Sequence, residues 1–309
     1  MKVEKRIWLL CLIFLAVFLG AQILEGLLLT PIMIGEIFRE IEKSGINTGN
    51  FFEVYKYTTQ AYEMSDGAIL AMLYLTVLAT VTACFYCVKI EKRSLATMGY
   101  TREKCLKKYI TGYGVGALII SAICMLCKAN GTLVVDTGKK NIPLLLLYIL
   151  AWGLQGLSEE TLCRGWLLSS ISVHHNNSIA VLVSALMFAL LHIANAGVTL
   201  IAFLNLFLFG VFAGIYYLKS KSIWGIAAVH SAWNCFQGTV FGINVSGMNP
   251  GSTIFSSQSQ DTLFSGGAFG LEGGIFVTIF LVIGIILLLN IGEMKKFFKK
   301  FVKMHKKKI

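Results

Sequence analysis

The sequence predicts an all-α, polytopic membrane protein with eight transmembrane helices. Of its 309 residues, 56% are hydrophobic and only 14% are charged, whereas soluble domains carry about 25% charged residues. The mean hydropathy of the chain is +0.72. Apolar runs long enough to cross a bilayer, which takes about 20 helical residues, recur along the whole chain. We find no repeat of fixed period and no separate soluble segment, and we therefore treat residues 1–309 as a single membrane domain.

The eight predicted helices follow the apolar runs, whose approximate bounds are 7–30, 67–90, 108–127, 142–171, 179–196, 197–218, 222–241 and 272–292. The first run follows three basic residues, as a signal peptide does. It stays apolar for over twenty residues and has no clear cleavage site, so we expect a retained anchor. The fifth and sixth runs are separated by the turn signal Asn195-Ala196-Gly197. Residues 242–270 are rich in Gly, Ser and Asn, which is typical of a loop, and we expect this loop to be able to fold back.

The distribution of basic residues predicts the orientation. If both termini are cytoplasmic, 20 of the 27 Lys and Arg residues lie on the inner side, 6 lie on the outer side, and Arg164 lies within the membrane. Loops with an excess of Lys and Arg stay in the cytoplasm. We therefore expect a multi-pass protein of the cell membrane with both termini cytoplasmic.

The formal net charge of the chain is +11, and most of the basic residues that cause it lie in predicted loops and tails. We assign it to topology and to contact with anionic lipid, and we expect no nucleic-acid partner. Residues 293–309 form a basic cytoplasmic tail that either lies on anionic headgroups or stops transfer across the membrane. Most of the eight cysteines, including the pairs at 84–87 and 124–127, lie in apolar runs, where we interpret them as small apolar side chains.

The fourth predicted helix carries three ionisable residues, and such residues inside a membrane usually mark function. Glu160 and Arg164 are four residues apart and therefore share one helix face, where they can form an ion pair. Glu159 points about 100° away from Glu160, so it is free to face a different wall. A carboxylate in such a place can act as a general base.

Further polar residues lie on the fifth and seventh predicted helices. His192 follows Phe188 by four residues, and His230 shares a helix face with Asn234. Glu159 and His192 could together hold and deprotonate a water molecule, while His230 and Asn234 could donate to an oxyanion. In an alternative reading, Glu159, His192 and His230 would ligate zinc or another divalent metal. We interpret His174, His175 and His305 as solvated residues outside the site.

Three short motifs resemble those of the CPBP family, and they occur in the same order along the chain. They are Glu-Glu-x-x-x-Arg, Phe-x-x-x-His and His-x-x-x-Asn. That family comprises the CAAX prenyl endopeptidases, their bacterial relatives called Abi proteins, and bacteriocin-processing or immunity proteins. Gly165, which follows the arginine, and the segment Gly-Ala-Phe-Gly-Leu-Glu-Gly-Gly at 267–274 are also similar to the family pattern. The core of the resemblance covers residues 142–241, and the first three helices are only generically similar.

The resemblance implies an eight-helix intramembrane endopeptidase with catalytic residues on helices four, five and seven. Glu159 would be the catalytic glutamate and His192 its partner in activating water. His230 and Asn234 would bind the oxyanion, and Glu160 and Arg164 would form the supporting ion pair. The family has been described both as a metalloprotease and as a metal-independent glutamate protease, so the cofactor stays open. The expected substrate is a membrane-associated peptide or protein, without a commitment to a prenylated one.

Two other classes of function compete with this reading. The first is a non-proteolytic bacteriocin-immunity or scaffold protein that retains the fold, but none of the motif positions has decayed. The second is a transporter with Glu and His as proton carriers, which favours internal pseudo-symmetry and helices broken in both halves. The chain has only three prolines, and we expect its intramembrane ionisable residues to be confined to helices four to seven.

Overall fold

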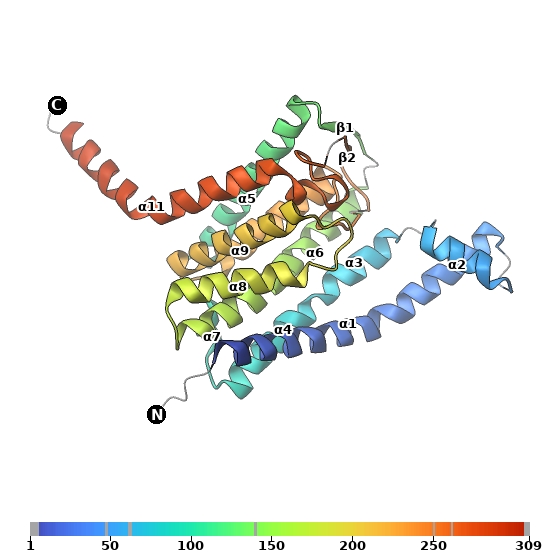
Figure 1. Ribbon diagram of the computed structural model, residues 1–309, viewed down its shortest axis with the longest axis horizontal. Coiled ribbons are helices and arrows are strands. Elements are labelled where there is room, and N and C mark those ends of the chain that lie inside the picture. The colour runs from blue at the N-terminus through green and yellow to red at the C-terminus, as the bar shows by residue number, and fades with distance from the viewer. Residues whose placement is uncertain are drawn as a thin grey trace.

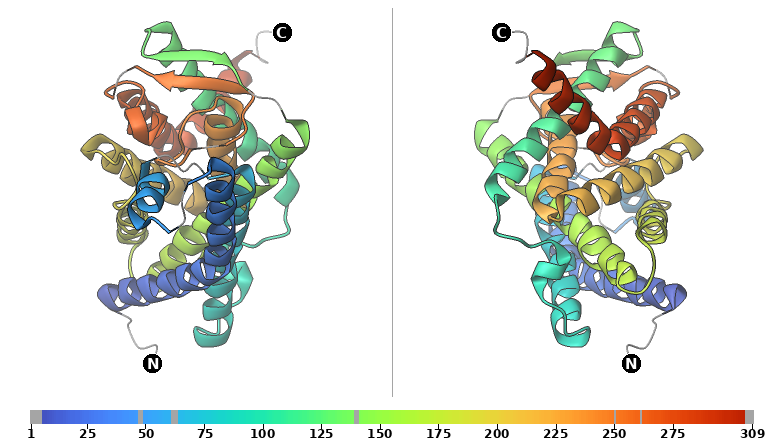
Figure 2. Two further views of the ribbon diagram at one scale, coloured as in Figure 1. Left: turned by 90° about the vertical axis from the view of Figure 1, so that its right-hand side faces the viewer. Right: turned by 90° about the vertical axis from the view of Figure 1, so that its left-hand side faces the viewer.

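A computed structural model describes residues 6–46, 49–60, 64–138, 141–249, 251–260 and 262–305. The chain is folded mostly into helices that run roughly parallel or antiparallel to one another (Figures 1 and 2). The α-helices are α1 Ile7–Ser44, α2 Phe51–Gln60, α3 Asp66–Leu75, α4 Val77–Phe85, α5 Cys105–Ala129, α6 Ile142–Glu160, α7 Ser169–Ser172, α8 Asn177–Leu191, α9 Leu200–Ser220, α10 Ile223–Cys235 and α11 Ile275–His305. Wide π-helical turns occur at η1 Tyr86–Ile90, η3 Thr161–Leu168 and η4 Phe236–Val240, and short 3-10 turns at η2 Leu95–Met98, η5 Gly267–Phe269 and η6 Leu271–Gly273.

Among the described residues, five helices are long and apolar enough to cross a membrane: Ile7–Ser44, Asp66–Ile90, Cys105–Ala129, Ile142–Ser172 and Leu200–Ser220. The prediction of a helical, multi-pass membrane protein is therefore confirmed at this level. Two of the remaining predicted spans correspond to shorter apolar helices, which are α8 and the apolar part of α11 at Ile275–Asn290. The third corresponds to α10 and its continuation η4. A count of eight complete spans stays a prediction.

The structure differs from the predicted helix bounds at α1, α8 and α11. α1 continues to Ser44, well beyond residue 30, and ends at Gly45, whose φ of 70° is left-handed. α8 ends at Leu191 instead of 196 because the chain turns through His192–Gly197, where Gly197 has a φ of 75°. α11 continues as a helix into the basic tail, but the expected contact of the tail with lipid concerns side chains outside the described residues.

The mostly helical structure is consistent with the expected all-α class, and the chain also forms a small antiparallel sheet that was not predicted from the sequence. β1 Leu133–Thr137 pairs with β2 Phe255–Ser259, with Leu133 opposite Ser259 and Thr137 opposite Phe255. Isolated two-stranded pairings are marginal in water, and the two strands lie more than a hundred residues apart in the sequence. Neither strand alone therefore gives a signal that outweighs the surrounding helical pattern.

The loops gather at two opposite ends of the molecule, as an alternation of spans requires. At one end the start of α1 borders the turn at His175, and the Trp224 indole donates to the carbonyl of Thr101 at 2.9 Å. At the other end lie the sheet and the Asp66 carboxylate, which accepts from the backbone N–H of Ser252 at 2.7 Å. In Figure 1 the first end is at the left and the second at the right. The segments predicted to be inner share one end and those predicted to be outer share the other.

Which end faces the cytoplasm is a prediction that thiol labelling can test. Single-cysteine reporters at 174 and 305, in an otherwise cysteine-free chain, should react with a membrane-impermeant reagent only after the inner face is opened. A reporter at 256, on β2, should react in intact cells. The reason is the excess of basic residues at the first end. Labelling at 174 or 305 in sealed cells would overturn the orientation.

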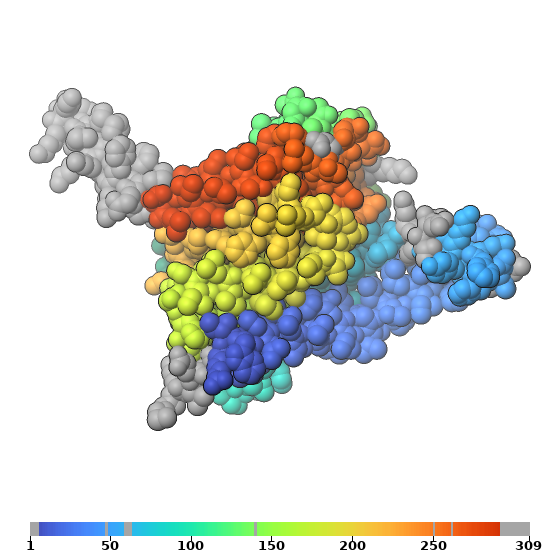
Figure 3. Space-filling view, in the orientation of Figure 1, coloured from blue at the N-terminus to red at the C-terminus, as the bar shows by residue number. Residues whose placement is uncertain are grey.

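The outer face of the helix bundle is apolar. Figure 3 shows a face formed largely by α1, α8 and α11. Large apolar side chains stand exposed on all three, among them Leu19, Ile23 and Leu27 of α1, Leu182 and Leu186 of α8, and Ile283 and Ile286 of α11. Exposed apolar area of this extent would drive a soluble protein to aggregate. It is the surface expected of helices that contact lipid.

Small residues allow α5 and α10 to approach each other closely. A Cβ added to Gly112 would lie 2.1 Å from the carbonyl oxygen of Gly225, and one added to Gly116 would lie 2.2 Å from that of Val229. Gly-x-x-x-Gly faces of this kind bring membrane helices together by backbone contact. This contact fixes α10, which carries His230 and Asn234, against its neighbour.

Gly116→Ala should destabilise the protein because the added methyl collides with backbone that cannot move aside. We expect a loss of about 1–3 kcal/mol, seen as a lower thermal midpoint in detergent. Gly114→Ala is the matched control, since nothing lies within 4 Å of a Cβ at that position. Equal midpoints for the two variants would contradict this packing.

Candidate active site

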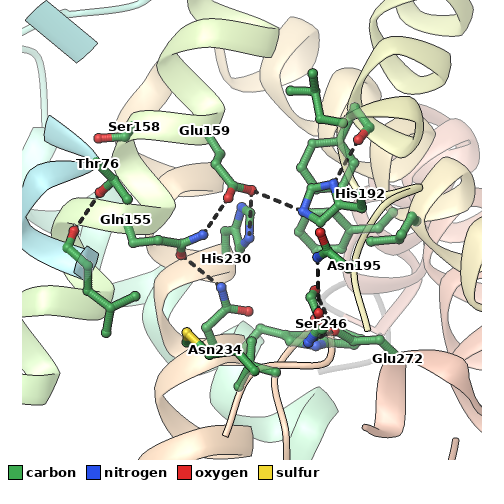
Figure 4. A pocket seen from close by; sticks show the side chains of 18 of the residues that line it. Thr76, Gln155, Ser158, Glu159, His192, Asn195, His230, Asn234, Ser246 and Glu272 are labelled. Carbon is green, nitrogen blue, oxygen red and sulfur yellow. Dashed lines mark hydrogen bonds and ion pairs between the residues drawn. The ribbon is translucent and has the colours of Figure 1, made fainter. Parts of the chain in front are cut away.

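A cavity of about 300 Å³ lies within the helix bundle. This volume is at the lower end of the range of about 300–1,000 Å³ that is usual for ligand sites. Its wall contains residues of α1, α3, α6, α8, α9, α10 and the start of α11, together with parts of the 242–274 loop. Four of the six predicted site residues line it: Glu159, His192, His230 and Asn234. Figure 4 shows Glu159 of α6, His192 from the turn after α8, and His230 of α10 directed toward one another.

Glu160 and Arg164 lie behind the cavity wall and are fully buried. The expected contact is present, with Arg164 Nη1 donating to Glu160 Oε1 at 2.9 Å. The guanidinium carbon also lies 4.5 Å from the centre of the Phe188 ring, a cation–π contact. Breaking such a buried pair is costly, because the remaining charge is left without compensation.

The same Glu160 oxygen fixes the orientation of His230. It lies 2.9 Å from His230 Nδ1, and a carboxylate paired with arginine accepts, so Nδ1 carries the hydrogen. The other ring nitrogen, Nε2, then faces Glu159 Oε2 at 3.7 Å. Glu160 thus connects the arginine to the histidine at the cavity wall.

His192 is oriented by the backbone one turn earlier. Its Nδ1 lies 2.9 Å from the carbonyl oxygen of Phe188. A carbonyl can only accept, so Nδ1 carries the hydrogen and Nε2 of the neutral ring is an acceptor. This Nε2 lies 3.8 Å from Glu159 Oε2. The Phe188-x-x-x-His192 motif therefore supplies both the ring beneath Arg164 and the oxygen that holds His192.

Glu159 Oε2 faces the imidazoles of His192 and His230 but forms a hydrogen bond with neither. Distances of 3.7 and 3.8 Å exceed a hydrogen bond and are of the size that a bridging water spans. Oε2 is buried and has no hydrogen-bond partner among the described residues. Its other oxygen, Oε1, accepts from Gln155 Nε2 at 2.6 Å.

Gln155 also connects Glu159 to Asn234. Asn234 Nδ2 donates to Gln155 Oε1 at 2.8 Å, and Figure 4 shows the glutamine amide between the carboxylate and the asparagine. Asn234 Oδ1 is buried and unpartnered within the described part of the chain. The amide oxygen is therefore an available acceptor at the cavity, and the donor role expected of Asn234 stays a prediction.

Two π-helical turns, which are wider than an α-helix, begin directly after the site residues of α6 and shortly after those of α10. The π-helical turn η3 begins at Thr161, next to Glu160, and η4 begins at Phe236, two residues after Asn234. Wide turns of this kind occur in single stretches and frequently at functional sites. They change the direction in which the following side chains point, and a strict 3.6-residue pattern does not predict them.

Comparison with known protein families agrees with this geometry. Residues 141–236 match the family model described as type II CAAX prenyl endopeptidase Rce1-like. This segment belongs to the CAAX protease family. It contains all six predicted site residues and begins and ends close to the predicted core at 142–241. No curated protein and no solved structure matches the chain.

The CAAX protease segment does not supply the whole cavity, because sequence reasoning missed polar residues outside it. Glu25 and Gln22 of α1 and Glu272 of η6 line the cavity. Glu272 Oε2 accepts from the backbone N–H of Ser246 at 2.7 Å and from its hydroxyl at 2.8 Å. The expectation that intramembrane ionisable residues are confined to helices four to seven is therefore wrong. The sequence signal for this was Glu25, a lone acidic residue within the apolar run of α1.

The zinc alternative stays a prediction, which the chelator assay below tests. No group of three His, Cys, Asp or Glu side chains is arranged to hold a metal ion in the part of the chain that the structure describes. The set proposed from the sequence, Glu159, His192 and His230, has one oxygen between two nitrogens at 3.7 and 3.8 Å. We therefore derive no step through a metal.

Proposed function

We propose that the protein is an intramembrane endopeptidase that hydrolyses a peptide bond in a membrane-associated peptide or protein. The observation that carries this proposal is the position of Glu159 Oε2, a buried acceptor without a partner among the described residues, between the Nε2 atoms of His192 and His230. The match of residues 141–236 to the model of a protease family supports hydrolysis of a peptide bond as the reaction. A carboxylate facing two imidazoles is suited to activating water.

In the proposed reaction, a water molecule bridges Glu159 and His192. Glu159 takes one proton from it, and the oxygen attacks the carbonyl carbon of the scissile bond. Negative charge then develops on the former carbonyl oxygen. When the carbon–nitrogen bond breaks, the proton held by Glu159 passes to the leaving amine. The protein's contribution is a base held in place by Gln155 at the cavity wall.

Stabilisation of the developing oxyanion falls to His230 and Asn234. His230 uses its Nδ1 hydrogen on Glu160, so it donates to the oxyanion from Nε2 as the imidazolium, in which both ring nitrogens are donors. Asn234 Nδ2 donates one of its two hydrogens to Gln155, and the second is the donor proposed for the oxyanion. Gln155 thereby joins the base to the oxyanion donor through two hydrogen bonds.

Cleavage of a library of membrane-tethered peptides by the purified chain in detergent tests the proposed function. Product analysis by mass spectrometry should identify an internal cut that depends on Glu159. The same assay with a strong chelator decides between a metal-independent and a metal-dependent reaction. If no peptide is cut under either condition, the proposed function is wrong.

Gln155→Met should lower kcat/KM by about 10- to 100-fold, because the base and Asn234 both lose the group that positions them. Methionine keeps the length of the side chain, so folding should be little affected. A variant with the wild-type kcat/KM would remove Gln155 from the mechanism.

A further inference from the structure

Glu25 is a buried carboxylate on a helix that otherwise presents apolar side chains to lipid. Its neighbours Leu24, Leu27 and Leu28 are 46%, 67% and 53% exposed, whereas Glu25 is 8% exposed and lines the cavity. An ionisable group at this depth is expensive and usually functional. Nothing in the proposed hydrolysis uses it.

The hydrogen bonding of Glu25 is incomplete for an ionised carboxylate. Gln22 Nε2 donates to its Oε2 at 3.0 Å. No ion pair joins Glu25 to any Lys or Arg in the described ranges. Glu25 is also close enough to Glu159 for the two carboxylates to repel each other. An added cation would relieve this repulsion and supply the missing donors.

The rest of the polar wall is rich in acceptors. Three carboxylates line the cavity, and no Lys or Arg does so among the described residues. Asn234 Oδ1 and Glu159 Oε2 are buried acceptors without partners there. Asn234 itself is only 3% exposed, and Figure 4 shows its oxygen turned toward the cavity. The wall thus favours a ligand that brings donors and positive charge.

The remainder of the lining is apolar and includes Phe18, Met72, Leu73 and Leu206. Such side chains favour an apolar stretch of peptide around the charged group. A free carboxylate at the end of a peptide would meet three carboxylates and no Lys or Arg of the described wall. Charge therefore disfavours a site for a carboxyl-terminal acid next to the base.

We propose that Glu25, held by Gln22, binds a cationic side chain of the substrate, so that the substrate class is an apolar membrane peptide with a Lys or Arg near the scissile bond. This inference rests on the proposed endopeptidase function and specifies its substrate. Glu25 is a specificity-determining residue in this scheme, and Glu159 remains the base.

The test uses the full chain reconstituted into vesicles of neutral phosphatidylcholine, so that anionic lipid does not concentrate basic peptides. Mass spectrometry first locates the cut in a membrane-tethered peptide. Matched peptides then carry Lys, norleucine or Glu at successive positions on either side of it. At one position the Lys peptide should have a kcat/KM about tenfold above that of the norleucine peptide.

Variants of α1 separate charge recognition from other effects. Glu25→Gln should bring the Lys-to-norleucine ratio to about one, and Glu25→Lys should make the Glu peptide the better substrate. Gln22→Leu should lower the ratio by a smaller factor. Glu40→Gln is the matched control, since Glu40 lies on the same helix, pairs with Lys43 at the surface and should keep the wild-type ratio.

The outcomes distinguish this inference from the proposed function. If the wild-type chain cleaves all three peptides equally and Glu159→Gln abolishes that cleavage, the endopeptidase stands and the cation site is overturned. An unchanged ratio in Glu25→Gln also overturns it. Should Glu25→Gln fail to fold, the wild-type ratio and the Gln22→Leu variant still decide. If the wild-type chain cleaves no peptide, the proposed function itself fails.

Discussion

Glu159→Gln is expected to reduce peptide cleavage by about 10²- to 10⁴-fold, the usual contribution of a general base. In the wild-type protein Gln155 Nε2 donates to Glu159 Oε1 at 2.6 Å. The amide of the variant has the shape of the carboxylate, and its oxygen can still accept this hydrogen bond. It cannot take a proton from water. The loss should therefore appear in kcat, measured with a membrane-tethered peptide, while expression and the thermal midpoint stay close to wild type.

A second measurement separates loss of the base from loss of the fold. Glu159→Gln should still bind the peptide, and its elution profile in gel filtration should match that of the wild-type protein. A variant that turns over substrate at the wild-type rate would show that another group activates the water.

Arg164→Ala is expected to lower stability by about 3–5 kcal/mol, because it leaves a buried carboxylate without its partner. Glu160 and Arg164 are both fully buried, and Arg164 also packs on Phe188. The loss should extend to activity, since Glu160 orients His230 at 2.9 Å. Thermal unfolding in detergent and steady-state protein level provide the measurements.

The double variant Glu160→Gln/Arg164→Gln is the critical comparison. It removes both charges together and leaves two neutral amides, so it should be more stable than Arg164→Ala. A glutamine at 160 can still accept from His230 Nδ1. If Arg164→Ala proves the more stable of the two, the buried ion pair does not stabilise this region.

Much of the helical arrangement followed from the sequence, because apolar runs in lipid must satisfy their backbone within one segment. The Glu160–Arg164 contact followed from helical spacing alone. The gathering of Glu159, His192 and His230 was expected from the motif resemblance and from the rule that ionisable groups face the bundle interior. Their catalytic roles stay proposals that the variants above test.

Other features depend on contacts between distant segments, and these the sequence did not reveal. The β1–β2 pairing joins two stretches that carry no strong strand signal alone. The π-helical turns after Glu160 and Cys235 depend on how α6 and α10 pack. Glu272 was visible within the 267–274 segment, but its place in the cavity depends on the fold of the 242–274 loop.

The sequence by itself determined a membrane-embedded helical protein with a CAAX-protease-like set of acids, histidines and an amide on three late helices. Hydropathy and helical spacing are local properties and predicted the helices and the Glu160–Arg164 contact, while the resemblance of three short motifs to a known family supplied the set of site residues. Only the tertiary structure decided that Gln155 joins Glu159 to Asn234, and that Glu25 of the first helix shares their cavity. The physical reason is that hydrogen bonds and electrostatic contacts act over a few ångströms in space, regardless of the separation of their residues along the chain.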